Sequence, residues 1–172
     1  MKLEDVEKNI AEWIENFLQV DNPDLNGWSP CPFAGNARLK NSYDVRLGTE
    51  LYSDLMDLSR TKLDGHEVVI YAYPREFYTA EEFHSLVDSV NQGFLVPLDL
   101  IALDDHPDHP ESVNGVGFNN GHYALALVQS LSDLNQRAAS LAKKGFYDHW
   151  PEEYLEDLFR HRQDPRHDLR QD

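Results

Sequence analysis

The chain has 172 residues, of which 41% are hydrophobic and 11% aromatic, enough apolar material for the core of one domain. Its 31 acidic and 15 basic residues give a formal net charge of −16, which opposes binding to nucleic acid and to anionic membranes. The single cysteine, Cys31, excludes an intramolecular disulfide, as in many proteins of a reducing compartment. Without a secretory signal or a long apolar run at the N-terminus, we expect a cytoplasmic protein.

The N-terminal third predicts a helix, a long loop and a strand followed by a helix. Apolar residues recur every three or four positions over residues 3–19, the pattern of an amphipathic helix. Prolines and glycines over residues 21–41 predict an irregular loop. Residues 42–47 are a strand candidate, and Thr49 is the expected N-cap of the next helix. The inner face of that helix carries three leucines at helical spacing: Leu51, Leu55 and Leu58.

The middle of the chain predicts two strands joined by a helix. Residues 67–73 are almost all apolar and precede Pro74, which indicates a strand in the sheet centre, buried on both faces. Thr79 and Glu82 have the spacing of a capping box, so a helix is expected from there to Gly93. Residues 98–103 are the third strand candidate.

The last third predicts a long loop and two helices. Residues 104–121 are rich in proline, glycine and asparagine, which favours a loop. A long helix ending at Gly145 and a shorter one opened by Pro151 are expected next. The long helix is predicted from five apolar residues at helical spacing: Leu127, Leu131, Leu134, Ala138 and Leu141.

These elements predict one α/β domain over residues 1–163, with a polar, frayed tail at 164–172. The expected sheet is small, with three or four strands in βαβαβ order, flanked by an N-terminal helix and two C-terminal helices. Parallel neighbours joined by right-handed crossovers are expected. A ferredoxin-like α+β fold with antiparallel pairing is the alternative.

Ligands of open sheets usually bind beyond the carboxyl ends of the strands. This rule selects Tyr73 and Arg75 as candidate substrate-binding residues, together with the loop at 104–111. That loop carries two histidines and several acids, the ligand types of Zn or Fe(II), so it is a candidate site for a divalent metal. Its candidate ligands are Asp105, His106, Asp108 and His109. The alternative is a solvated turn whose acids bind local amides.

Two further segments carry candidate site residues. His122 and Tyr123 are candidate catalytic residues at the expected N-terminus of the long helix. Asn119 and Asn120 are candidate substrate-binding residues, with a simple N-cap role as the alternative. Cys31, between two prolines, is a candidate nucleophile, metal ligand or haem-thiolate ligand, although free cysteines are often only buried.

The order of several short motifs resembles an uncharacterised family of small bacterial proteins with a Cys-Pro-Phe-Ala signature. The likeness covers roughly residues 10 to 145, and is carried by Trp13, Cys31-Pro32-Phe33-Ala34, Tyr73-Pro74, His106-Pro107-Asp108 and the segment from Asn119 to Tyr123. It implies a shared α/β architecture and a shared site at Cys31 and His106. Tyr73 and Asn120 depart from the family, which has His and Arg at these places. If the family site uses that His, this protein either has lost the activity or uses His109 or His122 instead.

The sequence therefore predicts a small enzyme, a metal-dependent oxidoreductase or hydrolase that acts on a small molecule. The alternative is a non-catalytic acidic protein that binds a basic protein surface and resembles nucleic acid in its charge.

Overall fold

Four strands form the main sheet of the computed structural model, which describes residues 1–109 and 111–166. Their order in the sheet is β1-β2-β6-β3. The first two strands are parallel, and β6 pairs antiparallel with both of its neighbours. The strands are β1 (Tyr43–Leu47), β2 (Val68–Pro74), β3 (Leu100–Asp105) and β6 (Tyr123–Ser130). The α/β class and the small sheet with flanking helices are thus confirmed, with β2 in the sheet interior as expected.

The wholly parallel sheet was wrong, because residues 123–130 form a strand and not the first turns of a helix. Strand β6 lies between β2 and β3, so the two expected neighbours do not touch each other. The helix α5 (Leu131–Lys143) begins only after this strand, where the Ser130 hydroxyl accepts a hydrogen bond from the amide of Asp133. Ser130 is therefore the N-cap, and neither Asn119 nor Asn120 caps the helix.

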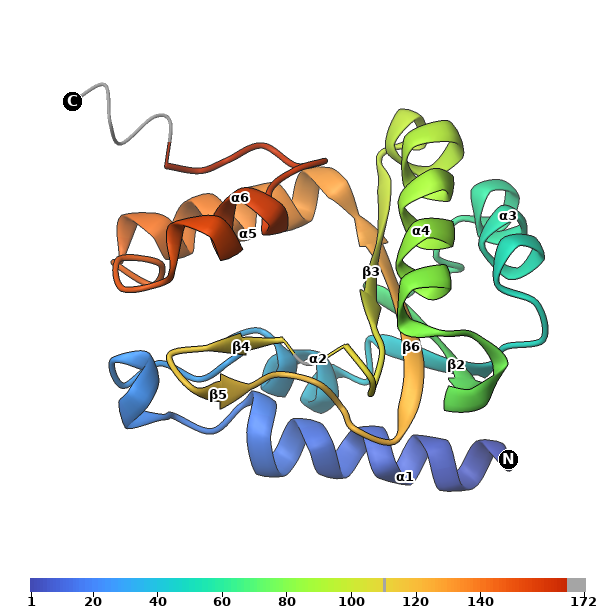
Figure 1. The fold of residues 1–172 in the computed structure, drawn as a ribbon, viewed down its shortest axis with the longest axis horizontal. Helices are drawn as coiled ribbons and strands as arrows, with labels where there is room; N and C mark the ends of the chain where they lie inside the picture. Colours follow the sequence, from blue (N-terminus) through green and yellow to red (C-terminus); the bar gives the residue numbers. More distant parts are fainter. Residues whose placement is uncertain (110, 167–172) are drawn as a thin grey trace.

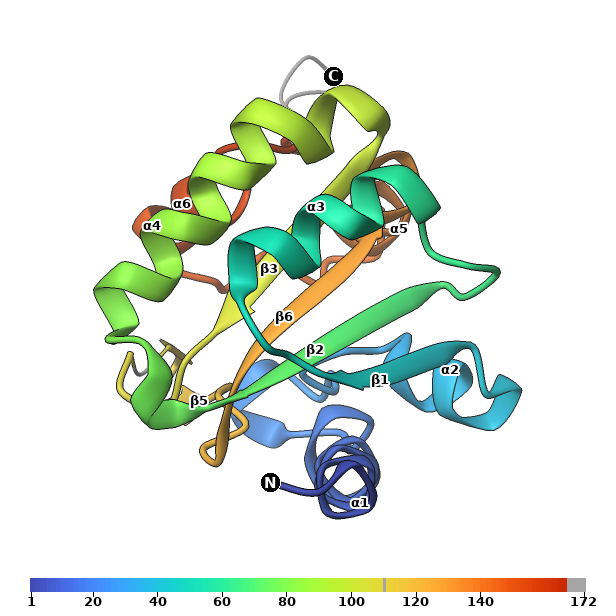
Figure 2. The ribbon, with the colours of Figure 1, turned by 90° about the vertical axis from the view of Figure 1, so that its right-hand side faces the viewer.

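Successive side chains of a strand point to opposite faces of the sheet, so each face packs against a different layer of helices. In β2, Val69, Tyr71 and Tyr73 belong to the core cluster under α3 (Leu51–Thr61) and α4 (Ala80–Val90). Ile70 and Ala72 belong to the cluster under α1 (Leu3–Trp13), on the other face. Figures 1 and 2 show α3 and α4 side by side over one face, with α1 along the opposite side.

The N-terminal helix is confirmed, and it continues as a π-helical turn over Ile14–Leu18. The loop expected at 21–41 is only partly irregular, because it contains a 3-10 turn and the helix α2 (Ala34–Lys40). Glu50, and not Thr49, is the N-cap of α3, since its carboxylate accepts the amides of Tyr52 and Ser53.

The capping box of Thr79 and Glu82 is present at the start of α4. This helix does not end at Gly93, because a π-helical turn over Asn91–Leu95 and a 3-10 turn over Val96–Leu98 continue it. A further 3-10 turn, Arg75–Phe77, follows β2.

The remaining elements lie beside β3 and β6 (Figure 1). A short hairpin of β4 (Ser112–Val113) and β5 (Val116–Gly117) interrupts the loop at 104–121. The helices α5 and α6 (Glu152–Leu158) share an aromatic-rich core cluster. In the tail expected at 164–172, Arg166 forms ion pairs with Asp164 and Glu152, and residues 167–172 lie outside the described residues. Within the described chain, no helix is long and apolar enough to span a membrane.

Candidate functional site

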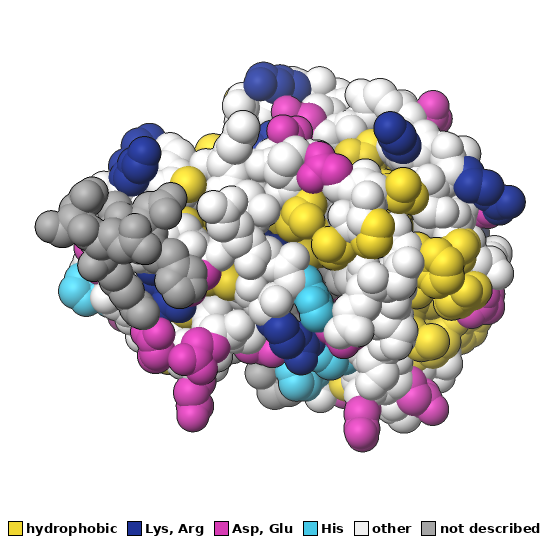
Figure 3. All heavy atoms as spheres, turned by 90° about the horizontal axis from the view of Figure 1, so that it is seen from above, with side chains coloured by type: hydrophobic (Ala, Val, Ile, Leu, Met, Phe, Trp, Pro, Cys, Tyr) yellow, Lys and Arg dark blue, Asp and Glu magenta, His cyan; other side chains and the backbone are white. Residues whose placement is uncertain are grey.

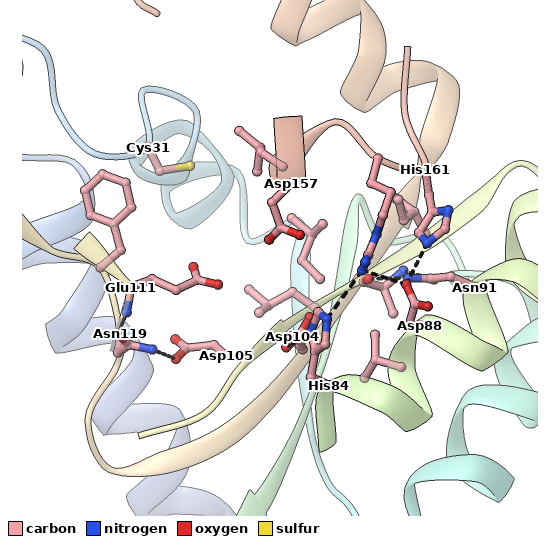
Figure 4. Close-up of a pocket in the computed structure, with 18 of the residues that line it drawn as sticks. Cys31, His84, Asp88, Asn91, Asp104, Asp105, Glu111, Asn119, Asp157 and His161 are labelled. Carbon is pink, nitrogen blue, oxygen red and sulfur yellow. Dashed lines mark hydrogen bonds and ion pairs between the residues drawn. The ribbon is translucent and has the colours of Figure 1, made fainter. Parts of the chain in front are cut away.

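A cavity of about 280 Å³ lies beside β3 and is lined by α4, α6, the residues that flank the hairpin and the loop that carries Cys31. We call it the carboxylate cleft, because acidic side chains dominate its polar lining (Figure 4). Its apolar wall includes Trp13, Leu103 and Phe118. Its polar lining comprises His84, Asp88, Asn91, Asp104, Asp105, Glu111, Asn119, Tyr154, Asp157, Arg160 and His161.

The end of β3 supplies two of the acids to this cleft. Because successive side chains of a strand point to opposite faces, Asp104 faces α4 while Asp105 follows Leu103 on the other face. Glu111 reaches the cleft from the loop before β4, and Asp157 from the last turn of α6. In Figure 4 the carboxylates of Glu111 and Asp157 extend into the same space.

Glu111 has the most useful acid–base chemistry of the group. Burial, together with the negative charges of Asp104, Asp105 and Asp157, raises the pKa of Glu111 to about 7. The hydroxyl of Tyr154 donates a hydrogen bond of 3.4 Å to the Glu111 carboxylate, which opposes this rise only in part. This carboxyl therefore exchanges its proton near neutral pH, as general acids and bases do.

The opposite wall of the cleft carries an ion pair and two contacts between a histidine and a carboxylate. Asp88 binds Arg160 at 2.9 Å and His161 at 2.6 Å, which ties the segment after α6 to α4. The His84 Nδ1 and the Asp104 carboxylate are hydrogen-bonded at 3.0 Å, which holds the end of β3 against α4. In Figure 3, which views the molecule from above, histidine and basic side chains lie next to acidic ones near the middle of the visible surface.

The wall formed by Asp105, Glu111 and Asp157 differs from that ion-paired wall. In the described part of the chain, no lysine or arginine forms an ion pair with any of these three acids. The cleft is thus polarised, because the acids on the side of Glu111 have no basic partner among the described residues.

His106 has a structural role in place of the metal-binding role expected from the sequence. Its side chain is buried, and its Nε2 donates to the backbone oxygens of Arg75 at 3.2 Å and Tyr78 at 2.9 Å. Its Nδ1 accepts the amide of Asp108 at 3.0 Å. Because both ring nitrogens are engaged, neither has a lone pair directed at a ligand.

Asp105 and the two asparagines hold the loop after β3 in place. The Asn119 amide donates to the Asp105 carboxylate and to the backbone oxygens of His106 and His109, at 2.9 to 3.1 Å. The backbone amide of Asn120 donates to the second Asp105 oxygen at 3.0 Å. Burial nevertheless raises the pKa of Asp105, because it outweighs these hydrogen bonds. Of the two asparagines, only Asn119 lines the cleft.

The other expected ligands are dispersed at the surface. Asp108 forms an ion pair with Arg75, and the exposed His109 ring stacks on His84 at 6.4 Å between ring centroids. Across residues 1–109 and 111–166, no three or more His, Cys, Asp or Glu side chains are grouped closely enough to hold a metal ion. The four ligands proposed from the sequence therefore do not form one centre.

Two further candidates lie away from the cleft. Tyr73 is fully buried on the α3 and α4 face, where its hydroxyl donates to Asp54 at 2.9 Å, so it does not face a substrate there. His122 lies at the same sheet edge as His106, since Tyr123 pairs with Pro74, but it is exposed beside Tyr123. The two histidines do not share a site.

Cys31 is the one sequence-predicted catalytic residue that lines the cleft. It is half-buried, and its sulfur points into the cavity in Figure 4. Burial raises the pKa of the Cys31 thiol, which disfavours the thiolate that a nucleophile or a metal ligand requires. A role for this residue as a haem or metal ligand stays a prediction.

Sequence reasoning missed the residues that give the cleft its chemistry. The sequence pattern does not distinguish Glu111 from the other acids of its loop, although this residue follows Pro110 and directly precedes the hairpin. Tyr154 and Asp157 lie three residues apart on α6, which places them on one helical face. This spacing is the one feature of the sequence that indicates a shared site for Tyr154 and Asp157.

Comparison of the chain with protein-family models, with curated proteins and with solved structures gives no match in any of the three. The resemblance to the Cys-Pro-Phe-Ala family therefore stays a prediction.

Proposed function

We propose that the protein is a small-molecule enzyme whose carboxylate cleft binds a cationic amine and whose Glu111 exchanges a proton with it. The charge of the cleft supports this choice of ligand, because Asp105, Glu111 and Asp157 lack basic partners among the described residues. An ammonium group would compensate that charge, whereas a phosphate or a carboxylate ligand would add to it.

Aromatic side chains of the cleft favour the same ligand class. Phe118 and Tyr154 meet edge to face, with ring centroids 6.4 Å apart and an interplanar angle of 89°. Together with Trp13 they give the cleft three aromatic walls next to its acids. Faces of aromatic rings attract cations, and most strongly where water is excluded.

The observation that carries the proposal is the Glu111 carboxyl, which lines the cleft and has a pKa of about 7. Such a group is both protonated and ionised at neutral pH, so it serves as general acid in one step and as general base in the next. Tyr154 acts as a positioning residue, because its hydroxyl holds one carboxylate oxygen of Glu111.

Proton linkage provides the test. A bound cation stabilises the ionised form of Glu111, so binding of n-propylamine at neutral pH should release a fraction of a proton. Calorimetric titration in buffers with different ionisation enthalpies measures this number directly. Glu111→Gln should abolish the release and weaken propylamine binding at least tenfold.

Glu156→Gln is the matched control, because Glu156 is an exposed acid of α6 that does not line the cleft. It removes the same charge and should leave both affinity and proton release unchanged. n-Propanol should not bind, since it lacks the charge. Propylamine binding that survives in Glu111→Gln, or that releases no proton in the wild type, would reject the proposal.

The metal dependence and the acidic interaction surface expected from the sequence stay predictions. The same protein can be melted with added Zn, Mn or Fe(II), because a ligand that binds only the folded state raises the melting temperature. A rise that Glu111→Gln removes would place a metal among the carboxylates of the cleft and would favour the metal-dependent enzyme.

A further inference from the structure

A second cavity, of about 200 Å³, lies between the sheet and the helices α1 and α2. We call it the apolar cavity, because its lining is almost entirely hydrophobic and includes Ile14, Ala37 and Ile70. A cavity of this kind does not attract water, and a smaller engineered one, of about 150 Å³, stays dry and binds benzene. Its chemistry is suited to an alkyl or aryl group.

The apolar cavity adjoins the carboxylate cleft. Five residues line both: Trp13, Leu18, Cys31, Leu103 and Leu127. In Figure 4, Cys31 projects from its loop toward the acids of the cleft, and the same residue lines the apolar cavity, so an acidic chamber and an apolar one meet at these shared residues. A single ligand that occupies both chambers would have a charged end and an apolar end.

An unpaired polar atom marks this shared wall. The indole N–H of Trp13 is buried and has no hydrogen-bond partner among residues 1–109 and 111–166. Buried donors are rarely left unpaired, because the lost hydrogen bonds to water are not replaced. A ligand that carries an oxygen or nitrogen acceptor near its middle would satisfy this donor.

The far wall argues against a ligand with an acidic end. Arg137 lines the apolar cavity, but its guanidinium binds Glu67 at 3.3 Å and lies over the ring of Phe33 at 5.4 Å. Its charge is therefore already compensated. A carboxylate at that end of the ligand would have to compete with Glu67.

We propose that the substrate is an amphipathic amine, whose ammonium group lies in the carboxylate cleft and whose apolar body passes Cys31 and Trp13 into the apolar cavity. This inference rests on the proposed function, because the cleft must recognise the cation. It adds the substrate class: a primary amine with a hydrophobic body of about six carbons, judged from the cavity that holds benzene, and with an oxygen or nitrogen acceptor near its middle for the Trp13 N–H.

A series of n-alkylamines from propyl to octyl tests the inference by calorimetry. Each methylene that enters the apolar cavity should tighten binding about fourfold, until the cavity is full. n-Alkanols of the same lengths are the probes for chain burial without the cation.

Ala37→Phe fills the apolar cavity from a position that does not itself line the cleft. It should remove the dependence on chain length and leave propylamine affinity unchanged. Asn36→Phe, which adds the same bulk at an exposed neighbour on α2, is the matched control. Ala34→Leu replaces Ala37→Phe if circular dichroism shows that the latter is unfolded.

Modification of Cys31 by a thiol reagent gives a second readout that needs no variant. Octylamine should slow the reaction, because its chain passes the thiol, whereas propylamine should not.

The outcomes separate the two proposals. Propylamine binding that depends on Glu111 but does not tighten with chain length overturns this inference and leaves the proposed function standing. Chain-length dependence that persists in Ala37→Phe also overturns it, since the chain would then lie elsewhere. Alkanols that bind as tightly as the amines reject cation recognition, and so do probes that fail to bind at all; both results overturn the two proposals together.

Discussion

The carboxyl of Glu111 binds its proton more tightly in the folded chain, because burial and neighbouring acids raise its pKa from 4.5 to about 7. Between these values only the folded state holds the proton, so stability falls as the pH rises through this range. Glu111→Gln removes this pH-dependent loss of stability, because glutamine does not ionise. The variant should match the wild type at about pH 4 and exceed its free energy of unfolding by about 3 kcal/mol at about pH 8.

Urea denaturation at the two pH values measures this difference. A carboxyl placed for chemistry at the expense of stability is typical of functional sites. Equal stability of the two proteins at the higher pH would show that Glu111 ionises as an ordinary surface acid.

Alanine substitutions of His106 and His109 provide a second test at the level of single residues, with stability as the measured quantity. His106→Ala leaves two backbone oxygens and one amide without their partner and creates a cavity, so it should cost about 3 kcal/mol of stability. His109→Ala removes an exposed ring and should cost less than about 0.5 kcal/mol. Thermal melting compares them, and a metal site would instead make the two variants respond alike to added metal.

At the scale of elements, β6 is expected to be the most protected segment of the sheet. It pairs with β2 on one side and β3 on the other, and the side chains of Ala124, Leu125, Ala126 and Val128 are fully buried. Its amides should therefore exchange with solvent only through global unfolding. Hydrogen exchange read by mass spectrometry tests this; exchange of β6 as fast as that of α2 would contradict the topology.

Strand β6 also shows why local sequence patterns do not predict every element of the fold. Alanine and leucine are strong helix formers, and Leu127 lies four residues before Leu131, so the local pattern over 123–130 favours a helix. Pairing along both edges overrides that preference. By contrast, β2 and the capping box of α4 were predictable, because a long apolar run and a paired Thr79 and Glu82 are decided locally.

At the scale of the whole molecule, the cleft draws its lining from segments spread along the sequence from Trp13 to His161. The rule about strand ends, which depends only on the direction of the strand, singles out the loop after β3, and Asp105 and Glu111 of that loop line the cleft. It could not assign roles within that loop. Whether Asp105 or His106 faces the cleft or the interior is decided by contacts with Asn119 and with the backbone at Arg75.

Because the net charge is −16, added salt should raise the stability of the protein and lower its affinity for an amine. Raising the salt concentration from about 0.1 M to about 1 M shortens the Debye length from about 10 Å to about 3 Å. Repulsion among the surface acids is then screened, so the melting temperature should rise. Attraction of an amine to the cleft is screened as well, so propylamine affinity should fall several-fold.

Calorimetry and thermal melting in the same salt series measure both effects, and Glu156→Gln should follow the wild type in each. The pair of results is informative because a simple change in folding would move stability and affinity together. Affinity that is indifferent to salt would mean that the acids of the cleft do not attract the cation, and would leave its aromatic walls as the only source of binding.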